Sequence, residues 1–322
     1  MRIVALVPSY AAIGIAAPIL VLLCRLVQGF ALGGEVGPST AFLVEAAPAG
    51  RRGLYVSLQY AGQGLAVVAA GVSGVALAGV MSDAMLAAWG WRIAMALGVA
   101  IVPIGLALRG SLRETLTAAT IAQPAPPLAG YARVVVFAFL TLLSTTVATY
   151  VLNYMTTYAK TVLRLPSGVA FGASVVVGVA TMAGSLIGGV VSDRWGRRPV
   201  MIWPMAAATV AVLPGFWLVS RYPGAISLYL VSAVLRLTSA AATTAALVTV
   251  TERLPPRIRS GALAIVYALA ISVFGGSTQF VIAKLTEVTG DPLAPAWYML
   301  AALLVGLVAM ITAREVTASA RR

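Results

Sequence analysis

Histidine is absent from this sequence, and cysteine and charged residues are scarce. The 322 residues contain no His, one Cys and 10% charged residues. Without an imidazole, histidine metal sites, histidine-based catalysis and histidine proton relays are excluded, so any proton carrier must be an aspartate or a glutamate. The single cysteine, Cys24, excludes an internal disulfide and lies in an apolar run, which indicates a packing role. We expect no metal ion and no cofactor.

Apolar residues dominate the composition. They make up 61% of the chain, and the mean hydropathy is +0.98, whereas a soluble domain is about 45–50% apolar and about 25% charged. The net charge of +13 is dispersed over short turns instead of gathering on one face, so a nucleic-acid partner is not expected. The sequence predicts an all-α polytopic membrane protein that lies in the lipid bilayer.

Apolar runs of about 20 residues predict helices that span a membrane. The chain opens with Ile3–Ile15, which Pro8 interrupts and which is too short to span. Nine complete spans are expected after this stub. They are Pro18–Glu45, Leu54–Val80, Trp91–Leu108, Ala132–Tyr158, Ala170–Val191, Val200–Val219, Ile226–Thr251, Ala262–Leu285 and Ala296–Ala313.

A polar segment, Arg109–Gly130, separates these spans into two groups. It contains the proline-rich stretch Pro124–Pro127, which is typical of a linker between domains. Residues 1–108 are then an incomplete amino-terminal bundle with the stub and three spans, 109–130 a linker, and 131–322 a bundle of six spans. Basic residues concentrate in alternate turns, in the linker and in the carboxyl-terminal tail, and the positive-inside rule makes these segments cytoplasmic.

One turn holds an unusual density of charge. Each charge would cost roughly 2.5–3.5 kcal/mol at the centre of a bilayer, so this segment is expected to be a short aqueous turn between two helices. The four charged residues fall within six positions between two apolar runs, and they are Asp193, Arg194, Arg197 and Arg198.

The span Pro18–Glu45 has two distinct faces. At ~100° per residue, Gln28 lies at about −60° and Glu35 at about −80° from Arg25, so these polar groups share one stripe. Arg25 is expected to contact an anion or to act as a charge in proton coupling; a structural ion pair near the outer surface is the alternative. Glu35 is the candidate proton carrier, because burial favours the protonated carboxyl; a packed, paired or permanently protonated Glu35 is the alternative. The adjacent face carries a ridge for close helix packing, formed by Gly29, Gly33 and Gly37.

Further candidates for a substrate site lie on other spans. Arg236 is the only charged residue in Ile226–Thr251, which favours a position facing a cavity. Two arginines on separate helices, Arg25 and Arg236, suit a small anion, because a guanidinium can hold a carboxylate with two parallel hydrogen bonds. Other groups could bind a polar solute or else pair neighbouring helices; they are Gln59, Gln63, Tyr150, Asn153 and Tyr154.

Several motifs resemble those of one transporter family. The pattern Asp193-Arg-Trp-Gly-Arg-Arg198 resembles the cytoplasmic signature of the major facilitator superfamily. Its metabolite:proton symporter branch, with carriers of citrate, 2-oxoglutarate, shikimate and proline or betaine, is similar in the segments Arg25–Glu35, Leu43–Glu45, Arg51–Gly53, Trp89–Arg92 and Ser111–Thr115. The resemblance covers nearly the whole chain. It implies a two-bundle fold in which Pro18–Glu45 is the fourth helix of twelve, so that the first two helices are absent.

The resemblance also implies a gate at the cytoplasmic helix ends, where charged turns pair in one conformation and part in the other. A weak internal repeat lies in such turns, since Glu45–Gly53 and Glu252–Gly261 share the order acid, proline, arginine pair and glycine. Charges that serve only to orient the chain in the membrane are the alternative. The expected gate residues are Glu45, Arg51, Arg52, Asp193, Arg194, Arg197, Arg198 and Glu252.

These features predict a transporter and not an enzyme, since no nucleophile–base pair or metal-ligand cluster is recognisable in the sequence. The leading expectation is a monomeric symporter of the inner membrane, which carries a small carboxylate of the citrate or dicarboxylate type together with a proton by alternating access. A symporter for a zwitterionic osmolyte, of the proline or betaine type, is one alternative. A truncated product without transport activity is the other.

Overall fold

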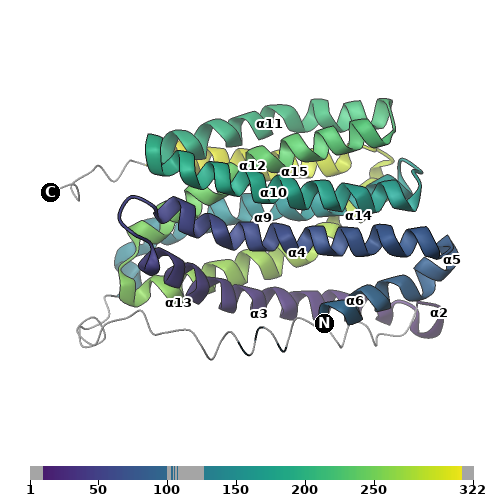
Figure 1. Cartoon of the computed structure of the whole chain (residues 1–322), viewed down its shortest axis with the longest axis horizontal. Coiled ribbons are helices and arrows are strands. Elements are labelled where there is room, and N and C mark those ends of the chain that lie inside the picture. The colour runs from purple at the N-terminus through teal and green to yellow at the C-terminus, as the bar shows by residue number, and fades with distance from the viewer. Residues whose placement is uncertain (1–9, 100–102, 104, 106, 108–126, 314–322) are drawn as a thin grey trace.

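The computed structural model describes residues 10–99, 103, 105, 107 and 127–313. These residues form helices joined by short turns and contain no β-strand, so the expected all-α class is confirmed. The long helices run side by side along the longest axis of the molecule (Figure 1). Within the described ranges, eight helical segments are long and apolar enough to cross a membrane.

Six of these segments are single α-helices, and they are α3 (Ala16–Ala46), α4 (Arg52–Val80), α10 (Ser167–Trp195), α11 (Arg197–Arg221), α12 (Ala225–Arg253) and α15 (Ala294–Thr312). A seventh, Leu128–Thr161, is α9 (Ala132–Thr161) with a 3₁₀ turn before it. The eighth is a composite of α13 (Pro256–Leu269), a π-helical turn η3 (Ala270–Gly275) and α14 (Gly276–Thr289). The shorter elements are α2 (Tyr10–Ile13), α5 (Asp83–Met85), the π-helical turn η1 (Leu86–Gly90), α6 (Trp91–Val99) and the 3₁₀ turn η2 (Leu128–Tyr131).

The helix boundaries lie close to the expected spans. Most helices extend a few residues beyond them, and α13 begins at Pro256, before the expected start at Ala262. For example, α10 runs from Ser167 to Trp195, whereas the apolar run covers residues 170–191. The helical hydrogen bonds continue into the polar flanks, which the apolar run alone does not mark. The expected span Trp91–Leu108 begins as α6, and beyond Val99 most of it lies outside the described residues. The expected linker, apart from its last residues, and the carboxyl-terminal tail also lie outside them.

Glycines bring α4 and α10 into close contact. A Cβ atom added at Gly64 would lie 2.7 Å from the carbonyl oxygen of Gly178, and one added at Gly189 would lie 2.5 Å from the carbonyl oxygen of Gly53. Both distances are too short for a real side chain, so the two backbones touch at the middle and at one end of the helix pair. Small residues permit such an approach between membrane helices.

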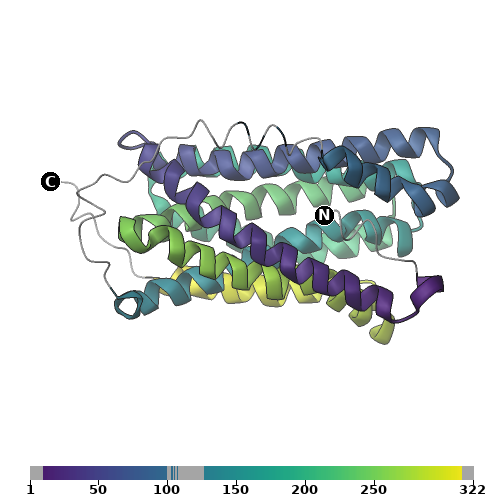
Figure 2. The same ribbon diagram turned by 90° about the horizontal axis from the view of Figure 1, so that it is seen from below.

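The predicted glycine ridge of α3 packs on α13 and η3, and Figure 2 shows α3 crossing beside α13. A Cβ atom on Gly29 would lie 2.7 Å from Cα of Ser272, and one on Gly33 would overlap the backbone of Ala268. The prediction that this face of the helix makes a close helix contact is confirmed. The amino-terminal helices α3 and α4 are therefore each attached to a helix from the carboxy-terminal part of the chain.

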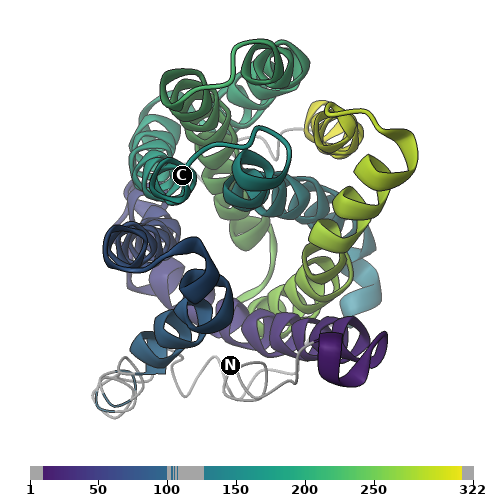
Figure 3. The same cartoon turned by 90° about the vertical axis from the view of Figure 1, so that its right-hand side faces the viewer.

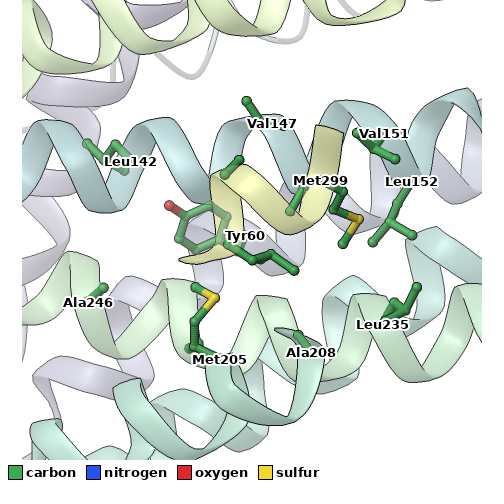
Figure 4. Close-up of a cluster of buried hydrophobic side chains, with 14 of the residues drawn as sticks. Tyr60, Leu142, Val147, Val151, Leu152, Met205, Ala208, Leu235, Ala246 and Met299 are labelled. Atoms are coloured by element: carbon green, nitrogen blue, oxygen red, sulfur yellow. The ribbon is translucent and has the colours of Figure 1, made fainter. Parts of the chain in front are cut away.

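The core lies where α9 and α12 meet their neighbours. Val151 on α9 and Met205 on α11 are fully buried. End-on, the green α11 and the purple α3 lie on opposite sides of the bundle (Figure 3). Figure 4 shows the side chains that meet in this core from α4, α9, α11, α12 and α15, among them Tyr60, Val147, Met205, Leu235 and Met299.

Charged residues collect at the two ends of the bundle. The end at which α3 is followed by α4 and α10 by α11 is called the basic end here; it carries Arg51, Arg52, Arg194, Arg197, Arg198 and Arg259. The opposite end is held by Asp83, which accepts a hydrogen bond from Ser167 and lies 3.7 Å from Nζ of Lys160. These contacts connect α5, which follows α4 closely, to α9 and α10.

Candidate functional site

Arg236 is a buried cation in the middle of α12. Its side chain is 5% exposed. The guanidinium donates from Nε to Thr181 Oγ1 of α10 at 2.6 Å and from Nη1 to Thr149 Oγ1 of α9 at 2.7 Å. In the part of the chain that the structure describes, no carboxylate lies within 4.0 Å of it. The partners of this charge are thus neutral hydroxyl groups.

A second buried polar group lies one helical turn before Arg236. Ser232 belongs to the same α12 and is fully buried, and its hydroxyl has no hydrogen-bond partner among the described residues. Residues four apart lie on the same face of a helix. Arg236 and Ser232 therefore share a buried face on which the Ser232 hydroxyl is without a partner among the described residues, and an unsatisfied polar group inside a protein is energetically costly.

Two tyrosines connect the amino-terminal and carboxy-terminal helices beside this arginine. The hydroxyls of Tyr60 on α4 and Tyr267 on α13 lie 2.6 Å apart, and these side chains are 8% and 4% exposed. Tyr60 lies within electrostatic range of Arg236. Neither tyrosine was predicted, because a buried Tyr in an apolar helix has no distinguishing pattern in the sequence.

A small cavity of about 70 Å³ lies between α3, α9 and the junction of η3 with α14. The predicted residues Gln28 and Tyr150 both line it. Gln279 of α14 lines it as well and was not predicted, since it is an isolated amide in an apolar run. The remaining lining residues are Gly29, Leu32, Gly275 and Gly276.

None of the other predicted substrate residues with a described side chain lines this cavity or hydrogen-bonds to Arg236. Gln59 accepts hydrogen bonds from Thr40 at 2.8 Å and from Ser39 at 3.4 Å. It therefore pairs α4 with α3, which was the alternative to a role in substrate binding. Gln63 is exposed. The remaining residues differ in burial: Asn153 is partly buried and Tyr154 buried on α9, and the side chain of Arg25, on α3, lies outside the described part.

The expected burial of Glu35 is not found. Its side chain is exposed on α3 in the described part of the chain, and Ser39 Oγ donates to its backbone carbonyl. The reason is the orientation of α3: the glycine ridge faces α13, and Glu35 lies about 160° around the helix from Gly33. The face that carries Glu35 is the one that packs least.

At the basic end, Asp193 connects α10 to the start of α4. Its Oδ1 accepts from the backbone N–H of Gly53 at 2.8 Å and its Oδ2 from that of Leu54 at 2.9 Å. The first N–H groups of a helix have no partner within the helix and carry a partial positive charge, so a carboxylate is favoured there. Arg197 Nη1 donates to the same carboxylate at 2.6 Å.

Ion pairs extend this contact to α12 and α13. Arg197 Nη2 lies 3.0 Å from Oε1 of Glu252, and Arg52 Nη1 lies 3.9 Å from the same atom. Arg259 Nη1 of α13 lies 3.2 Å from Oε1 of Glu45 at the end of α3. Four of the expected gate residues, Glu45, Arg52, Asp193 and Glu252, thus make contacts between amino-terminal and carboxy-terminal helices. Arg197 joins two of them, Asp193 and Glu252.

The other three expected gate residues do not take part in these contacts. Arg51 and Arg194 are exposed, and Arg198 Nη2 donates to the backbone carbonyl of Ile311 at 3.2 Å, which joins two carboxy-terminal helices. Arg259 was not predicted, although it is 8% exposed and also donates from Nε to the carbonyl of Thr251 at 2.8 Å. The internal repeat, in which Arg259 lies, was the available signal for it.

The arrangement of these helices agrees with a comparison against protein families. Residues 2–275 match the model of the Major Facilitator Superfamily. The chain belongs to the Major Facilitator Superfamily of membrane transporters, and the expected family is confirmed.

Similar proteins indicate to which branch of the superfamily the chain belongs. A citrate-proton symporter of Klebsiella pneumoniae is 34% identical over 314 residues, which cover 95% of this chain and 71% of that protein. An alpha-ketoglutarate permease of Escherichia coli (strain K12) is 32% identical, with 97% of this chain and 74% of the permease covered. A proline/betaine transporter of the same strain is 31% identical, with coverage of 97% and 66%. These relatives place the chain in the metabolite:proton symporter branch, among transporters and not enzymes.

A solved structure supports the fold. The proton:xylose symporter XylE, bound to 6-bromo-6-deoxy-D-glucose, superposes with a TM-score of 0.64 at 19% identity, covering 85% of this chain and 66% of XylE. At this level of identity the likeness concerns the arrangement of helices alone. The major facilitator fold expected from the sequence is thereby confirmed.

Proposed function

We propose that the protein carries a small carboxylate together with a proton across the inner membrane by alternating access. The observation that carries this proposal is Arg236, a buried guanidinium with two threonine hydroxyls as its hydrogen-bond partners. A buried charge without a counter-ion costs several kcal/mol. A carboxylate bound there would supply the missing negative charge and accept two parallel hydrogen bonds.

The substrates of the relatives agree with this chemistry. Citrate and alpha-ketoglutarate, which occur in the names of two relatives, are carboxylates. Proline and betaine, named for another relative, are zwitterions that also carry one carboxylate. A zwitterion is therefore the second substrate candidate, and the same arginine would bind its carboxylate end.

The contacts of the basic end are proposed to be the cytoplasmic gate. They join α4 to α10 through Asp193 and α3 to α13 through Glu45 and Arg259, so the basic end is closed in this conformation. In alternating access, two bundles rock about a central site, with residues 1–108 and 131–322 as the bundles and 109–130 as the cytoplasmic linker. We take the transporting unit to be a monomer.

Replacement of Arg236 tests the substrate proposal. Purified protein in vesicles with an imposed proton gradient should take up labelled citrate or 2-oxoglutarate, and Arg236→Ala should lower uptake at least a hundredfold, because roughly 3 kcal/mol is lost when a partner of a buried charge pair is removed. Arg236→Lys keeps the charge but not the bidentate geometry and should retain only part of the activity. The exposed Arg221→Ala is the matched control. Uptake that is unchanged in Arg236→Ala would reject the anion site.

Glu35 is retained as the proposed proton carrier, because it is the acid of α3 closest to the middle of that helix and histidine is absent. In Glu35→Gln, substrate entry should no longer bring protons with it, which a pH-sensitive dye inside the vesicles would report. Glu287→Gln, at an exposed ion pair with Lys284, is the control. If protons still enter with substrate in Glu35→Gln, a different carboxylate carries them.

A further inference from the structure

The cavity between α3, α9 and α14 combines polar side chains from three helices. Gln28, Tyr150 and Gln279 contribute two amides and one phenol hydroxyl, and no charged side chain lines it. An amide offers both donors and an acceptor, and a phenol can do either. Such a lining suits an uncharged group that both donates and accepts hydrogen bonds.

The backbone at this cavity has an uncommon conformation. The π-helical turn η3 ends at Gly275 and α14 begins at Gly276, and both glycines line the cavity. A Cβ atom on Gly275 would lie 2.7 Å from the ring of Tyr150, so a larger residue would displace that ring. Ser272 Oγ of η3 donates to the carbonyl of Leu26 on α3 at 2.7 Å. π-Helical turns within α-helices occur frequently at functional sites.

The cavity and the buried arginine are neighbours on α9. Thr149 accepts from Arg236 Nη1 at 2.7 Å, and the next residue, Tyr150, lines the cavity. Consecutive Cα atoms are about 3.8 Å apart, and their side chains diverge by about 100°. The contact of Thr149 with Arg236 and the cavity at Tyr150 therefore lie at the same level of α9, on faces about 100° apart.

We propose that this cavity is the subsite for the uncharged hydrogen-bonding group of the substrate, a hydroxyl or keto oxygen, and that Gln279 determines specificity for it. The inference rests on the proposed function, in which Arg236 holds a carboxylate. The volume of about 70 Å³ exceeds the ~10–15 Å³ that one water needs, so it accommodates a small polar group and not a whole tricarboxylate. The substrate class is then a hydroxy- or keto-carboxylate.

The test compares acids that differ only in this group. Equilibrium binding to the purified full chain is measured by calorimetry for citrate against propane-1,2,3-tricarboxylate, which lacks the hydroxyl, and for 2-oxoglutarate against glutarate, which lacks the keto oxygen. The wild type should prefer the hydroxy or keto acid about tenfold, which corresponds to ~1.4 kcal/mol. Gln279→Leu should reduce the preference to about twofold or less and leave the affinity for the plain acid unchanged.

Two further variants separate this role from a structural one. Gln279→Asn keeps an amide and should retain part of the preference. Phe280→Leu changes the next residue of α14, which is exposed at 58%, and should retain all of it. Binding of the plain acid by Gln279→Leu shows that this variant is folded.

Each remaining outcome decides between the two proposals. Equal binding of both acids of a pair by the wild type, or an equal loss for both in Gln279→Leu, overturns the subsite and leaves the carboxylate transporter intact. Binding of none of the four acids by the wild type, or undiminished binding of them by Arg236→Ala, overturns the proposed function and the subsite with it.

Discussion

Asparagine in place of Asp193 tests the proposal that the contact of this residue with α4 closes the basic end. The substitution keeps the size of the side chain, removes its charge and replaces one acceptor oxygen with an NH₂ donor. In the wild type, the two carboxylate oxygens accept from the N–H groups of Gly53 and Leu54 at 2.8 and 2.9 Å. An asparagine can accept from only one of them, and it faces the guanidinium of Arg197 without a negative charge.

The size of the effect follows from these contacts. The side chain of Asp193 is 8% exposed, so solvent screens its interactions little. A hydrogen bond to a charged group is worth about 1.5–3 kcal/mol, and a neutral one about 1 kcal/mol. One bond to the helix start is lost and the other becomes neutral, which together amounts to roughly 3 kcal/mol. The ratio of closed to open basic ends should therefore fall about a hundredfold.

Cysteine labelling reports this ratio. Ser57 on α4 is fully buried, and its Cβ lies 2.8 Å from where a Cβ on Gly189 would stand, so Ser57→Cys reacts with a maleimide when α4 and α10 separate. With Cys24→Ala as background, Asp193→Asn should raise the labelling rate about a hundredfold, or up to full accessibility. Equal rates with and without Asp193→Asn would refute the closing role of this carboxylate.

Arg194→Gln is the matched control for that experiment. Arg194 follows Asp193 directly in the sequence, but its side chain is exposed, and the labelling rate should not change. The sequence motif alone predicts a role in the gate for both residues, whereas the structure predicts an effect for one of them. An effect of equal size in Arg194→Gln would favour the motif over the observed contacts.

Two further predictions concern the contacts between the amino-terminal and carboxy-terminal helices. Gly33→Ala should destabilise the protein by about 1–3 kcal/mol through overpacking, because its Cβ would overlap the backbone of Ala268, while Gly34→Ala, with nothing within 4 Å, should not; thermal unfolding in detergent measures both, and equal stabilities would contradict the helix contact. Tyr60→Phe and Tyr267→Phe should each cost about 1 kcal/mol, the worth of one hydrogen bond. The double variant should cost no more than a single one, and additive losses would show that the two hydroxyls do not bond to each other.

The sequence predicted the helices because each carries its own signal. Long apolar runs such as Ala132–Tyr158 identify membrane helices by length and composition, without reference to the rest of the chain. The glycine ridge of α3 was predicted for the same reason, since spacing within one helix determines which residues share a face. Arg236 stood out as the one charge in an apolar run, and the structure buries it; that it faces a substrate cavity stays a prediction.

What the sequence did not predict depends on the mutual arrangement of helices. Tyr60 and Tyr267 are 207 positions apart, and neither has a local pattern that indicates the other. The exposure of Glu35 depends on which face of α3 packs against α13, and the polarity of that face alone does not decide this. Gln279 lies beside other polar side chains only because η3 brings α14 next to Tyr150.

The two charged repeats show how local patterns and helix arrangement combine. Glu45 of the first repeat pairs with Arg259 of the second, and Glu252 of the second lies 3.9 Å from Arg52 of the first. Each repeat thus supplies an acid from the end of one helix and an arginine near the start of the next. Each acid pairs with the arginine of the other repeat. A movement that separates α3 from α13 at the basic end would lengthen the Glu45–Arg259 pair. Because α4 follows α3 after a short turn, the same movement would also strain the Arg52–Glu252 pair.

Asp193 makes a further contact, which is of another kind than the ion pairs between the repeats. The repeats pair side chain with side chain, whereas Asp193 accepts from the backbone at the start of α4. Glycine at position 53 leaves room for this contact, because a Cβ there would lie 2.8 Å from Arg197 Nη1. Arg197 lies between the two systems, because its Nη1 contacts Asp193 at 2.6 Å and its Nη2 contacts Glu252 at 3.0 Å. Residues in one such network are not energetically independent. Arg197 therefore couples the contact of Asp193 with the start of α4 to the ion pairs between the repeats, and we expect these contacts to open together.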